Sequence, residues 1–374
     1  MSKKKILHII IGLNVGGAEL MLQRLVLNSS KKGGFEHCVI SLTDLGVIGP
    51  KLKEQGIKVY SLGMNSLSSL PLTLLKLRRL MKKIDPDVVQ TWMYHADFIG
   101  GLAAKSLGIK NIIWGIRTTD IEKSASKLTT YLSKVCANLS HVIPTTIVCV
   151  AEKAKEYHIN IGYDKKKFKV IPNGFDLSKF HFNSSLRSSM RKKLNITTDE
   201  LVIGHIGRFN PVKNQINFIE ACINLLEKGF KFKIIMAGRN INLDNPQIYS
   251  ALKDNKYKEH FIFLEEVKNP LSFYCTIDIF CLCSYSEGFP NVLGEAMACE
   301  NVCLSTDAGD ASLIMEPFGF HIKSPSTVDI AEAIESNIFL STDIDFETIG
   351  KNNRKKIDQY YSIDSVVRKF ESLY

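Results

Sequence analysis

The fold is decided by residues 284–310, SYSEGFPNVLGEAMACENVCLSTDAGD, together with the apolar run just before them. Residues 277–283 (IDIFCLC) have the length and composition of a buried strand. Gly288 and Pro290 predict a tight turn after this strand. The run VLGEAMAC that follows the turn has the apolar spacing of a helix. The stretch therefore predicts a strand, a turn and the beginning of a helix.

Two carboxylates, Glu287 and Glu295, stand eight positions apart across this turn. The beginning of a helix offers free backbone N–H groups and the positive end of the helix dipole to a ligand above the turn. Glu295 lies about one helical turn further on and can reach back to the same place. A ligand with both phosphate and hydroxyl groups, such as a nucleotide sugar, fits this arrangement. The alternative is an ordinary turn, with Glu295 as a solvated helix carboxylate.

Two further turns carry residues suited to phosphate. Gly16 and Gly17 follow the expected strand at residues 6–11 and let the backbone approach a ligand at a helix N-terminus. Arg208 and Lys213, in GRFNPVKN, follow the expected strand at residues 201–205 and suit a diphosphate. As alternatives, the glycines only close a strand–helix turn, and GRFNPVKN is a solvated loop.

Strands alternate with helices along the whole chain, which predicts an α/β fold with doubly wound parallel sheets. Open parallel sheets bind ligands at the carboxyl ends of their strands. His95 follows the expected strand at residues 87–91, and Arg117 and Asp120 follow the one at residues 112–116. His95 is either part of a site at this edge or an ordinary loop histidine.

Four segments together resemble glycosyltransferase family 4: GGAE after the first strand, IPNGFD near residue 175, GRFNPVKN, and the run from Glu287 to Glu295. The resemblance implies the GT-B fold, in which two Rossmann-like domains face each other across a cleft. Residues 1–175 would form the acceptor-binding domain and residues 176–350 the nucleotide-sugar-binding domain. Residues 351–374 would form a helix that crosses back to the first domain.

The resemblance also implies roles on the donor side. Glu295 would bind the ribose hydroxyls and Glu287 the hydroxyls of the donor sugar, while Arg208 and Lys213 would hold the diphosphate. The other positions expected against the sugar and the phosphates are Gly16, Gly17, Phe289, Pro290, Asn291 and Val292.

On the acceptor side, the resemblance places His95 near the acceptor hydroxyl and makes it a catalytic candidate beside Glu287, Arg208 and Lys213. Arg117 and Asp120 are expected on the same side. No metal ion and no cofactor are expected, because the two basic side chains would stabilise the leaving diphosphate.

The implied reaction is retaining transfer of a hexose or N-acetylhexosamine from a UDP-sugar to a hydroxyl of a lipid-linked saccharide. The implied setting is the synthesis of a bacterial surface polysaccharide, such as O-antigen, capsule or lipopolysaccharide, with a polyprenyl-diphosphate-linked acceptor. Three alternatives stay open: an enzyme like UDP-sugar 2-epimerase, a non-catalytic nucleotide-sugar-binding protein, and a nucleic-acid-binding protein. The sequence shows no aromatic-interleaved basic patch that would favour nucleic acid.

Length and composition describe a globular chain with room for two domains: 374 residues, 45% hydrophobic and 23% charged. Its nine cysteines are an odd number without a recurring C-x2-C pair, which predicts buried reduced thiols and a cytoplasmic protein. The first residues, MSKKKILHIIIGL, predict a buried strand and not a signal peptide. No run has the roughly 20 apolar residues of a membrane span.

Positive charge is concentrated in the first half of the chain. Residues 1–170 contain 26 Lys and Arg against 12 Asp and Glu, whereas the other 204 residues contain 22 against 26. Residues 67–84 add a helical pattern of leucines with a cluster of Lys and Arg at its end. This is either an ordinary amphipathic surface helix or one that lies on an anionic membrane. We therefore expect a peripheral protein on the inner face of the cytoplasmic membrane.

Overall fold

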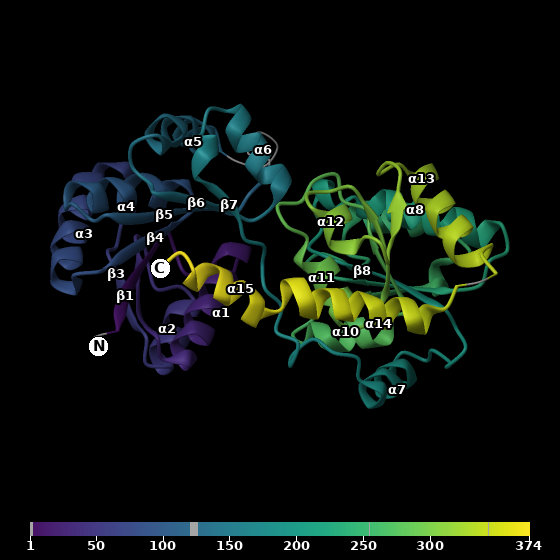
Figure 1. The fold of residues 1–374 in the computed structure, drawn as a ribbon. Coiled ribbons are helices and arrows are strands. Elements are labelled where there is room, and N and C mark those ends of the chain that lie inside the picture. Colours follow the sequence, from purple (N-terminus) through teal and green to yellow (C-terminus); the bar gives the residue numbers. More distant parts are fainter. Residues whose placement is uncertain (1–2, 120–125, 254, 343) are drawn as a thin grey trace. The chain divides into compact units, whose positions relative to one another are not determined.

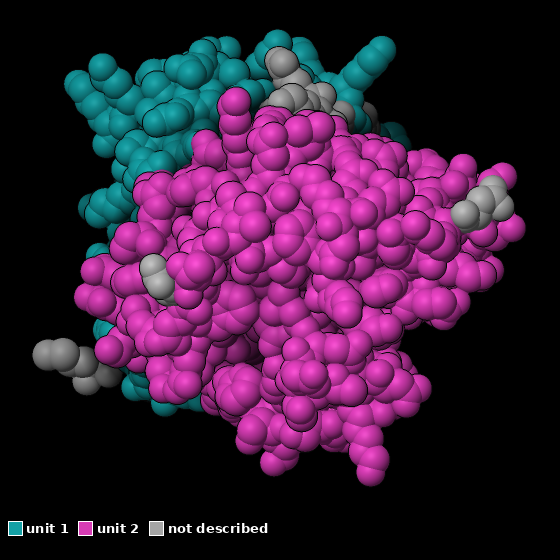
Figure 2. All heavy atoms as spheres, turned by 90° about the vertical axis from the view of Figure 1, so that its right-hand side faces the viewer, with its two compact units in different colours: residues 1–174, 363–374 teal, residues 175–362 magenta. Residues whose placement is uncertain are grey.

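The computed structural model describes residues 3–119, 126–253, 255–342 and 344–374. The chain divides into two compact units, which Figures 1 and 2 show. Unit 1 contains residues 1–174 and 363–374, and unit 2 contains residues 175–362. Each unit is built on a parallel sheet with helices between successive strands, so the predicted α/β class with two doubly wound domains is confirmed.

The sheet of unit 1 has seven parallel strands in the order β3-β2-β1-β4-β5-β6-β7. These strands are β1 (Lys4–Ile10), β2 (Phe35–Ser41), β3 (Lys58–Ser61), β4 (Val88–Trp92), β5 (Asn111–Ile116), β6 (Thr146–Cys149) and β7 (Phe168–Val170). The strand order changes direction between β1 and β4. Ligands of open parallel sheets bind outside the carboxyl ends of the strands at such a point. The segments after β1 and β4 carry Gly16 and His95.

Six helices of unit 1 lie between these strands: α1 (Gly17–Lys32), α2 (Ile48–Glu54), α3 (Leu70–Ile84), α4 (Tyr94–Ser106), α5 (Lys127–Ser140) and α6 (Glu152–Asn160). The helix expected over residues 67–84 is present, although its first three residues form a 3-10 turn and α3 begins at Leu70. Its buried residues, Thr73, Leu77 and Met81, lie four positions apart and form one face.

Unit 2 repeats this plan with six parallel strands in the order β10-β9-β8-β11-β12-β13. These strands are β8 (Val202–Ile206), β9 (Lys233–Ala237), β10 (Phe261–Leu264), β11 (Ile279–Leu282), β12 (Val302–Thr306) and β13 (Phe320–Ile322). Here the direction changes between β8 and β11. The segment after β8 carries Arg208 and Lys213, and the segment after β11 carries Glu287.

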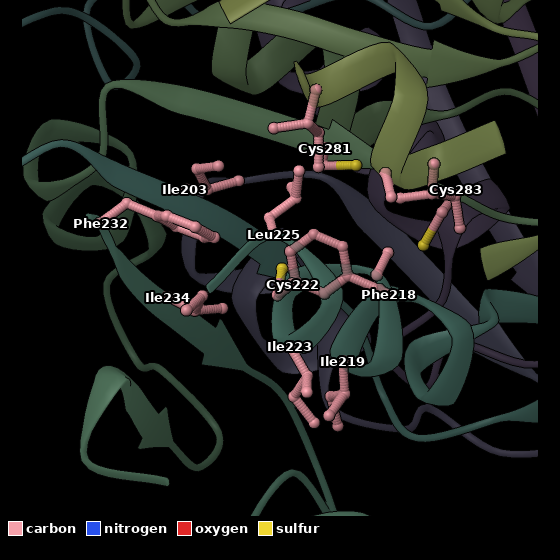
Figure 3. Packing of buried hydrophobic residues seen from close by; sticks show 14 of the residues in the cluster. Ile203, Phe218, Ile219, Cys222, Ile223, Leu225, Phe232, Ile234, Cys281 and Cys283 are labelled. Atoms are coloured by element: carbon pink, nitrogen blue, oxygen red, sulfur yellow. The ribbon is translucent and has the colours of Figure 1, made fainter. Parts of the chain in front are cut away.

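The helices of unit 2 are α7 (Ser184–Lys193), α8 (Gln215–Glu227), α9 (Pro246–Leu252), α10 (Pro270–Thr276), α11 (Asn291–Ala298), α12 (Ala311–Met315), α13 (Thr327–Ile334) and α14 (Phe346–Lys356). Phe218, Cys222 and Leu225 on α8 are buried in its core (Figure 3). They belong to the same cluster as Ile203 of β8 and Ile234 of β9. Burial of this apolar helix face is what holds α8 on the sheet.

The chain returns to unit 1 after Ser362. The sequence-based boundary at residue 351 falls inside α14, which belongs to unit 2 because Arg354 donates hydrogen bonds to the carbonyls of Phe180 and Ala298. A π-helical turn (Ile357–Tyr361) follows, and α15 (Ile363–Glu371) lies in unit 1. There the ring of Phe370 stacks on Trp92 with 6.1 Å between centroids.

All nine cysteines are buried and none forms a disulfide, as expected. Within the described ranges, no helix combines the length and the apolarity that crossing a membrane requires.

Candidate functional site

The side chains of two asparagines, Asn210 and Asn214, hold the segment after β8 in place. The side chain of Asn210 accepts a hydrogen bond from the Val212 amide at 3.0 Å and so begins a 3-10 turn, Pro211–Lys213. Asn214 then adopts the left-handed conformation, with φ of 62°, and its Nδ2 donates to the Cys283 carbonyl at 3.0 Å. This bond ties the segment after β8 to the end of β11. The turn thereby carries Lys213 toward the segment that contains Glu287.

Glu287 is the centre of a small charged cluster in unit 2. Lys213 Nζ lies 2.6 Å from Glu287 Oε1, and the hydroxyl of Ser284 donates to the same oxygen at 2.7 Å. The side chains of Lys213 and Glu287 are only 24% and 10% exposed. Hydrogen bonds between charged groups at this distance are among the stronger ones in proteins. The carboxylate is therefore fixed in position and paired with a cation.

A glycine after β12 supports the backbone of this cluster. Gly309 has a φ of +60°, and a Cβ at this position would lie 2.6 Å from the carbonyl oxygen of Glu287. Both the left-handed conformation and the close approach require a residue without a side chain. The segments after β8, β11 and β12 thus meet at Glu287.

Glu295 lies in the first turns of α11 and meets a buried tyrosine. The hydroxyl of Tyr274, on α10, donates to Glu295 Oε2 at 3.0 Å. Burial raises the pKa of Tyr274 well above its ordinary value, and the negative charge of Glu295 raises it further. The phenol is therefore protonated at neutral pH and acts as a donor to the carboxylate.

The residues in the turn before α11 and at the start of α11 differ in how deeply they are buried. Phe289 and Pro290 are buried, whereas Asn291 and Val292 are half-buried. The Asn291 amide donates to the Phe289 carbonyl at 2.9 Å, and the Leu293 amide donates to the Pro290 carbonyl at 3.1 Å. Arg208, in the segment after β8, is exposed. The structure thus brings Lys213 and Glu287 into contact and leaves Arg208 at the surface.

The glycines after β1 lie at the N-terminus of α1. Gly16 is the N-cap residue in extended conformation, and Gly17 is exposed. The Glu19 carboxylate folds back over this turn, since a Cβ on Gly16 would lie 2.4 Å from Glu19 Oε2. Burial raises the pKa of Glu19, and its hydrogen bond to its own backbone amide opposes that shift. The carboxylate therefore lies close to the positive end of the α1 dipole.

His95 and Arg117 lie after neighbouring strands of unit 1. His95 is half-buried near the start of α4, and burial lowers its pKa. Arg117 follows β5 and is bound through Nη2 to the side-chain oxygen of Asn173. Its guanidinium also lies 5.7 Å from the ring centre of Trp92. Burial lowers the pKa of Arg117 to about 10, so it is still a cation at neutral pH. Asp120 lies outside the described residues.

Sequence reasoning missed the hydroxyl groups that hold the two carboxylates. Ser284 lies two residues after the end of β11, at the carboxyl edge of the sheet, a position that could have suggested it. Tyr274 gives no such signal, because it lies on α10 and reaches Glu295 only through the tertiary fold. In the part of the chain that the structure describes, no group of three or more His, Cys, Asp or Glu could hold a metal ion.

Two parallel-sheet units, each with polar residues after the strands where the order reverses, define the GT-B class of fold. Residues 15–179 match the model of glycosyltransferase family 4, and residues 187–356 match the model of group 1 glycosyl transferases. The chain therefore belongs to glycosyltransferase family 4, and this part of the prediction is confirmed.

Relatives and solved structures agree with this assignment. The capsular polysaccharide biosynthesis glycosyltransferase CapM of Staphylococcus aureus is 27% identical, over 81% of this chain and 80% of its own length. An Escherichia coli UDP-Gal:α-D-GlcNAc-diphosphoundecaprenol α-1,3-galactosyltransferase is also 27% identical, over 81% of this chain and 78% of its own. Anabaena HepE, solved with UDP, has the same fold, with a TM-score of 0.85, 20% identity and 98% coverage of both chains.

Proposed function

We propose that this protein is a retaining, metal-independent glycosyltransferase that uses a UDP-sugar. It would transfer a hexose or N-acetylhexosamine to a hydroxyl of a polyprenyl-diphosphate-linked saccharide during surface polysaccharide synthesis. The observation that carries the proposal is the contact of Lys213 and Ser284 with Glu287 at the reversal point of the unit 2 sheet. UDP in the HepE structure and the lipid-linked acceptor in the name of the E. coli relative support the donor and acceptor classes.

The cluster suits both parts of a nucleotide sugar. Lys213 and Ser284 both bind Oε1 of Glu287, so Oε2 is the oxygen that would accept hydrogen bonds from donor-sugar hydroxyls. An ammonium group has three N–H donors, and Lys213 uses one of them for Glu287. The others would bind oxygens of the diphosphate, together with Arg208. Glu295 would bind the ribose hydroxyls.

In the reaction, the bond between the anomeric carbon of the sugar and the diphosphate breaks while the acceptor oxygen bonds to the same carbon on the same face. The acceptor proton would pass to the leaving phosphate, so that no protein nucleophile is required. Lys213 and Arg208 would stabilise the negative charge that develops on UDP. His95 and Arg117 would bind the acceptor in unit 1.

We also propose that α3 holds the protein on the inner face of the membrane. Leu72 and Leu75 are exposed on this helix, beside the exposed Lys76 and Arg79. Exposed apolar groups next to cations are typical of helices that lie on anionic lipid surfaces. The excess of Lys and Arg in the first half of the chain also favours binding to an anionic membrane.

The transferase proposal is tested by measuring UDP release from a panel of UDP-sugars, with and without a bacterial lipid extract. We expect acceptor-stimulated release from one donor, and its loss in Glu287→Ala. Glu266→Ala is the matched control, since Glu266 is an exposed carboxylate of the same unit. Release from no donor would contradict the proposal. Interconversion of UDP-sugars without an acceptor would identify an epimerase, and binding without release would identify a non-catalytic protein.

The membrane proposal is tested by sedimentation with phosphatidylglycerol vesicles at low and high salt. Replacement of four exposed cations on α3, Lys76, Arg79, Lys82 and Lys83, by Ala should abolish salt-sensitive binding. The control replaces Lys165 and Lys166, which are exposed elsewhere on unit 1, and should retain most of it. Equal binding by both variants would show that α3 is not the contact.

A further inference from the structure

Tyr274 is a buried polar residue whose only described side-chain hydrogen bond is to a carboxylate of the site. Its side chain is fully buried on α10, and its hydroxyl donates to Glu295 Oε2 at 3.0 Å. A phenylalanine would fill the same space, so packing alone does not require the hydroxyl. A tyrosine hydroxyl in the interior needs a partner, and here the partner is the residue proposed to bind the ribose.

The ring of Tyr274 is held rigidly. Phe180, Phe273 and Phe280 surround it in edge-to-face contacts, with ring centroids 5.4–6.2 Å apart. Its carbonyl oxygen accepts a hydrogen bond from Asn301 Nδ2 at 3.0 Å, which fixes α10 to the segment between α11 and β12. The hydroxyl therefore has one well-defined position relative to α11. Glu295, by contrast, has a long, half-buried side chain with several rotatable bonds.

We propose that Tyr274 is a positioning residue that orients the Glu295 carboxylate for recognition of a nucleotide ribose. This inference rests on the proposed donor site and extends it to a residue that does not itself touch the ligand. The hydrogen bond selects one rotamer of Glu295 before the nucleotide binds, so the cost of ordering the carboxylate is not subtracted from the binding free energy. The consequence is selectivity for ribonucleotides over 2′-deoxyribonucleotides.

The test compares the dissociation constants of UDP and 2′-deoxy-UDP, measured by calorimetry on the whole chain. Wild type should bind UDP more tightly than 2′-deoxy-UDP. Tyr274→Phe keeps the ring and removes the hydroxyl. It should weaken UDP binding roughly ten-fold, the effect of one hydrogen bond to a charged group. It should weaken 2′-deoxy-UDP binding much less, so that the ratio of the two constants falls toward one.

Three further variants separate positioning from a structural effect. In a Glu295→Gln background, Tyr274→Phe should leave the ratio unchanged, because the two residues act through one interaction. Tyr249→Phe, at an exposed tyrosine of the same unit, is the matched control and should behave as wild type. Phe273→Leu disturbs the packing around Tyr274 and should weaken both ligands by similar factors.

The outcomes are distinguishable. An unchanged ratio in Tyr274→Phe, with wild type binding UDP normally, would overturn the role of Tyr274 and leave the proposed donor site intact. Equal weakening of both ligands by Tyr274→Phe would show that the tyrosine is only structural. Failure of wild type to bind UDP would overturn the donor site and this inference together.

Discussion

The two units share one architecture, yet each contains a buried polar network of a different kind. In unit 2, Asp278 follows α10 and pairs with two arginines of α7: Arg187 at 2.5 Å and Arg191 at 2.7 Å. Arg191 is only 4% exposed and also donates to the carbonyls of Thr276 and Thr197. Unit 2 is thus held at this place by buried charges.

Unit 1 has a buried chain of neutral side chains, His8, His37 and Ser29, that leads to a carboxylate on α15. His8 Nε2 lies 2.9 Å from His37 Nδ1, and His37 Nε2 lies 2.9 Å from the hydroxyl of Ser29. That hydroxyl donates to Glu371 Oε1 at 2.8 Å, while Trp92 Nε1 donates to His8 Nδ1 at 3.3 Å. An indole only donates and a carboxylate only accepts, so each histidine carries its proton on Nε2.

The two networks respond differently to a change of charge. An additional proton on His8 or His37 places two donors opposite each other, and burial lowers the pKa of both groups. The ion cluster of unit 2 pairs one carboxylate with two guanidinium groups, so removal of the carboxylate leaves a buried cation without a counter-ion. Unit 1 is therefore sensitive to acid, whereas unit 2 is sensitive to the loss of a single charge.

The largest expected effect is on the stability of unit 2. Asp278→Ala leaves Arg191 buried without its counter-ion and should cost about 3–5 kcal/mol of unfolding free energy. Both tryptophans, Trp92 and Trp114, are buried in unit 1, so their fluorescence reports on that unit alone. In urea, we expect faster hydrogen exchange at the backbone amides of β8 and β11. The midpoint of the unfolding transition followed by tryptophan fluorescence should not change. Asp244→Ala, at an exposed position, should change neither.

The next effect concerns catalysis in unit 2. Lys213→Ala removes the cation beside Glu287 and should lower kcat roughly 10²–10³-fold in the UDP-release assay. Lys213→Arg should retain part of the activity, because the charge is kept and its geometry is not. Lys231→Ala is a control at an exposed lysine of the same unit. A Lys213→Ala enzyme with unchanged kcat would show that the contact with Glu287 has no catalytic role.

A third effect is expected in the pH dependence of the stability of unit 1. Burial lowers the pKa of His37 and of His158, each to about 4, below the value of about 6.5 in an unfolded chain. Between these values the unfolded state binds more protons, so the stability of unit 1 is complete above about pH 6.5 and falls as the pH decreases toward 4. The loss is at most roughly 1.4 kcal/mol per pKa unit for each histidine.

Urea titrations followed by tryptophan fluorescence from pH 7 to pH 4.5 measure this effect. His37→Gln should reduce the slope of stability against pH, and His141→Gln, at an exposed histidine, should leave it unchanged. A wild-type unfolding free energy that does not change with pH would contradict the neutral state of the buried histidines in unit 1. An equal loss of stability in unit 2 over the same pH range would contradict the proposed difference between the units.

Much of the fold was predictable from local patterns. Continuous apolar runs gave most strands, and leucine spacing gave α3, because period and composition depend on neighbouring residues only. Two strands were missed. β7 and β13 have three residues each, and β7 is not fully buried, so neither has a recognisable apolar run. The sequence predicts the return to the first unit too early, at residue 351 and not at Ile363, because helical spacing does not show which unit a helix packs against.

Sequence patterns were sufficient to identify the family, the alternation of strands and helices, and the residues after β8 and β11 that form the charged cluster. These follow from motif spacing and from the rule that parallel strands present their carboxyl ends at one edge. Three contacts became visible only in the folded chain: Ser284 and Lys213 share one oxygen of Glu287, Tyr274 donates to Glu295, and Glu371 of α15 accepts from Ser29. The physical reason is that a hydrogen bond depends on distance and direction in space. Residues far apart in the sequence leave no periodic pattern of such a contact.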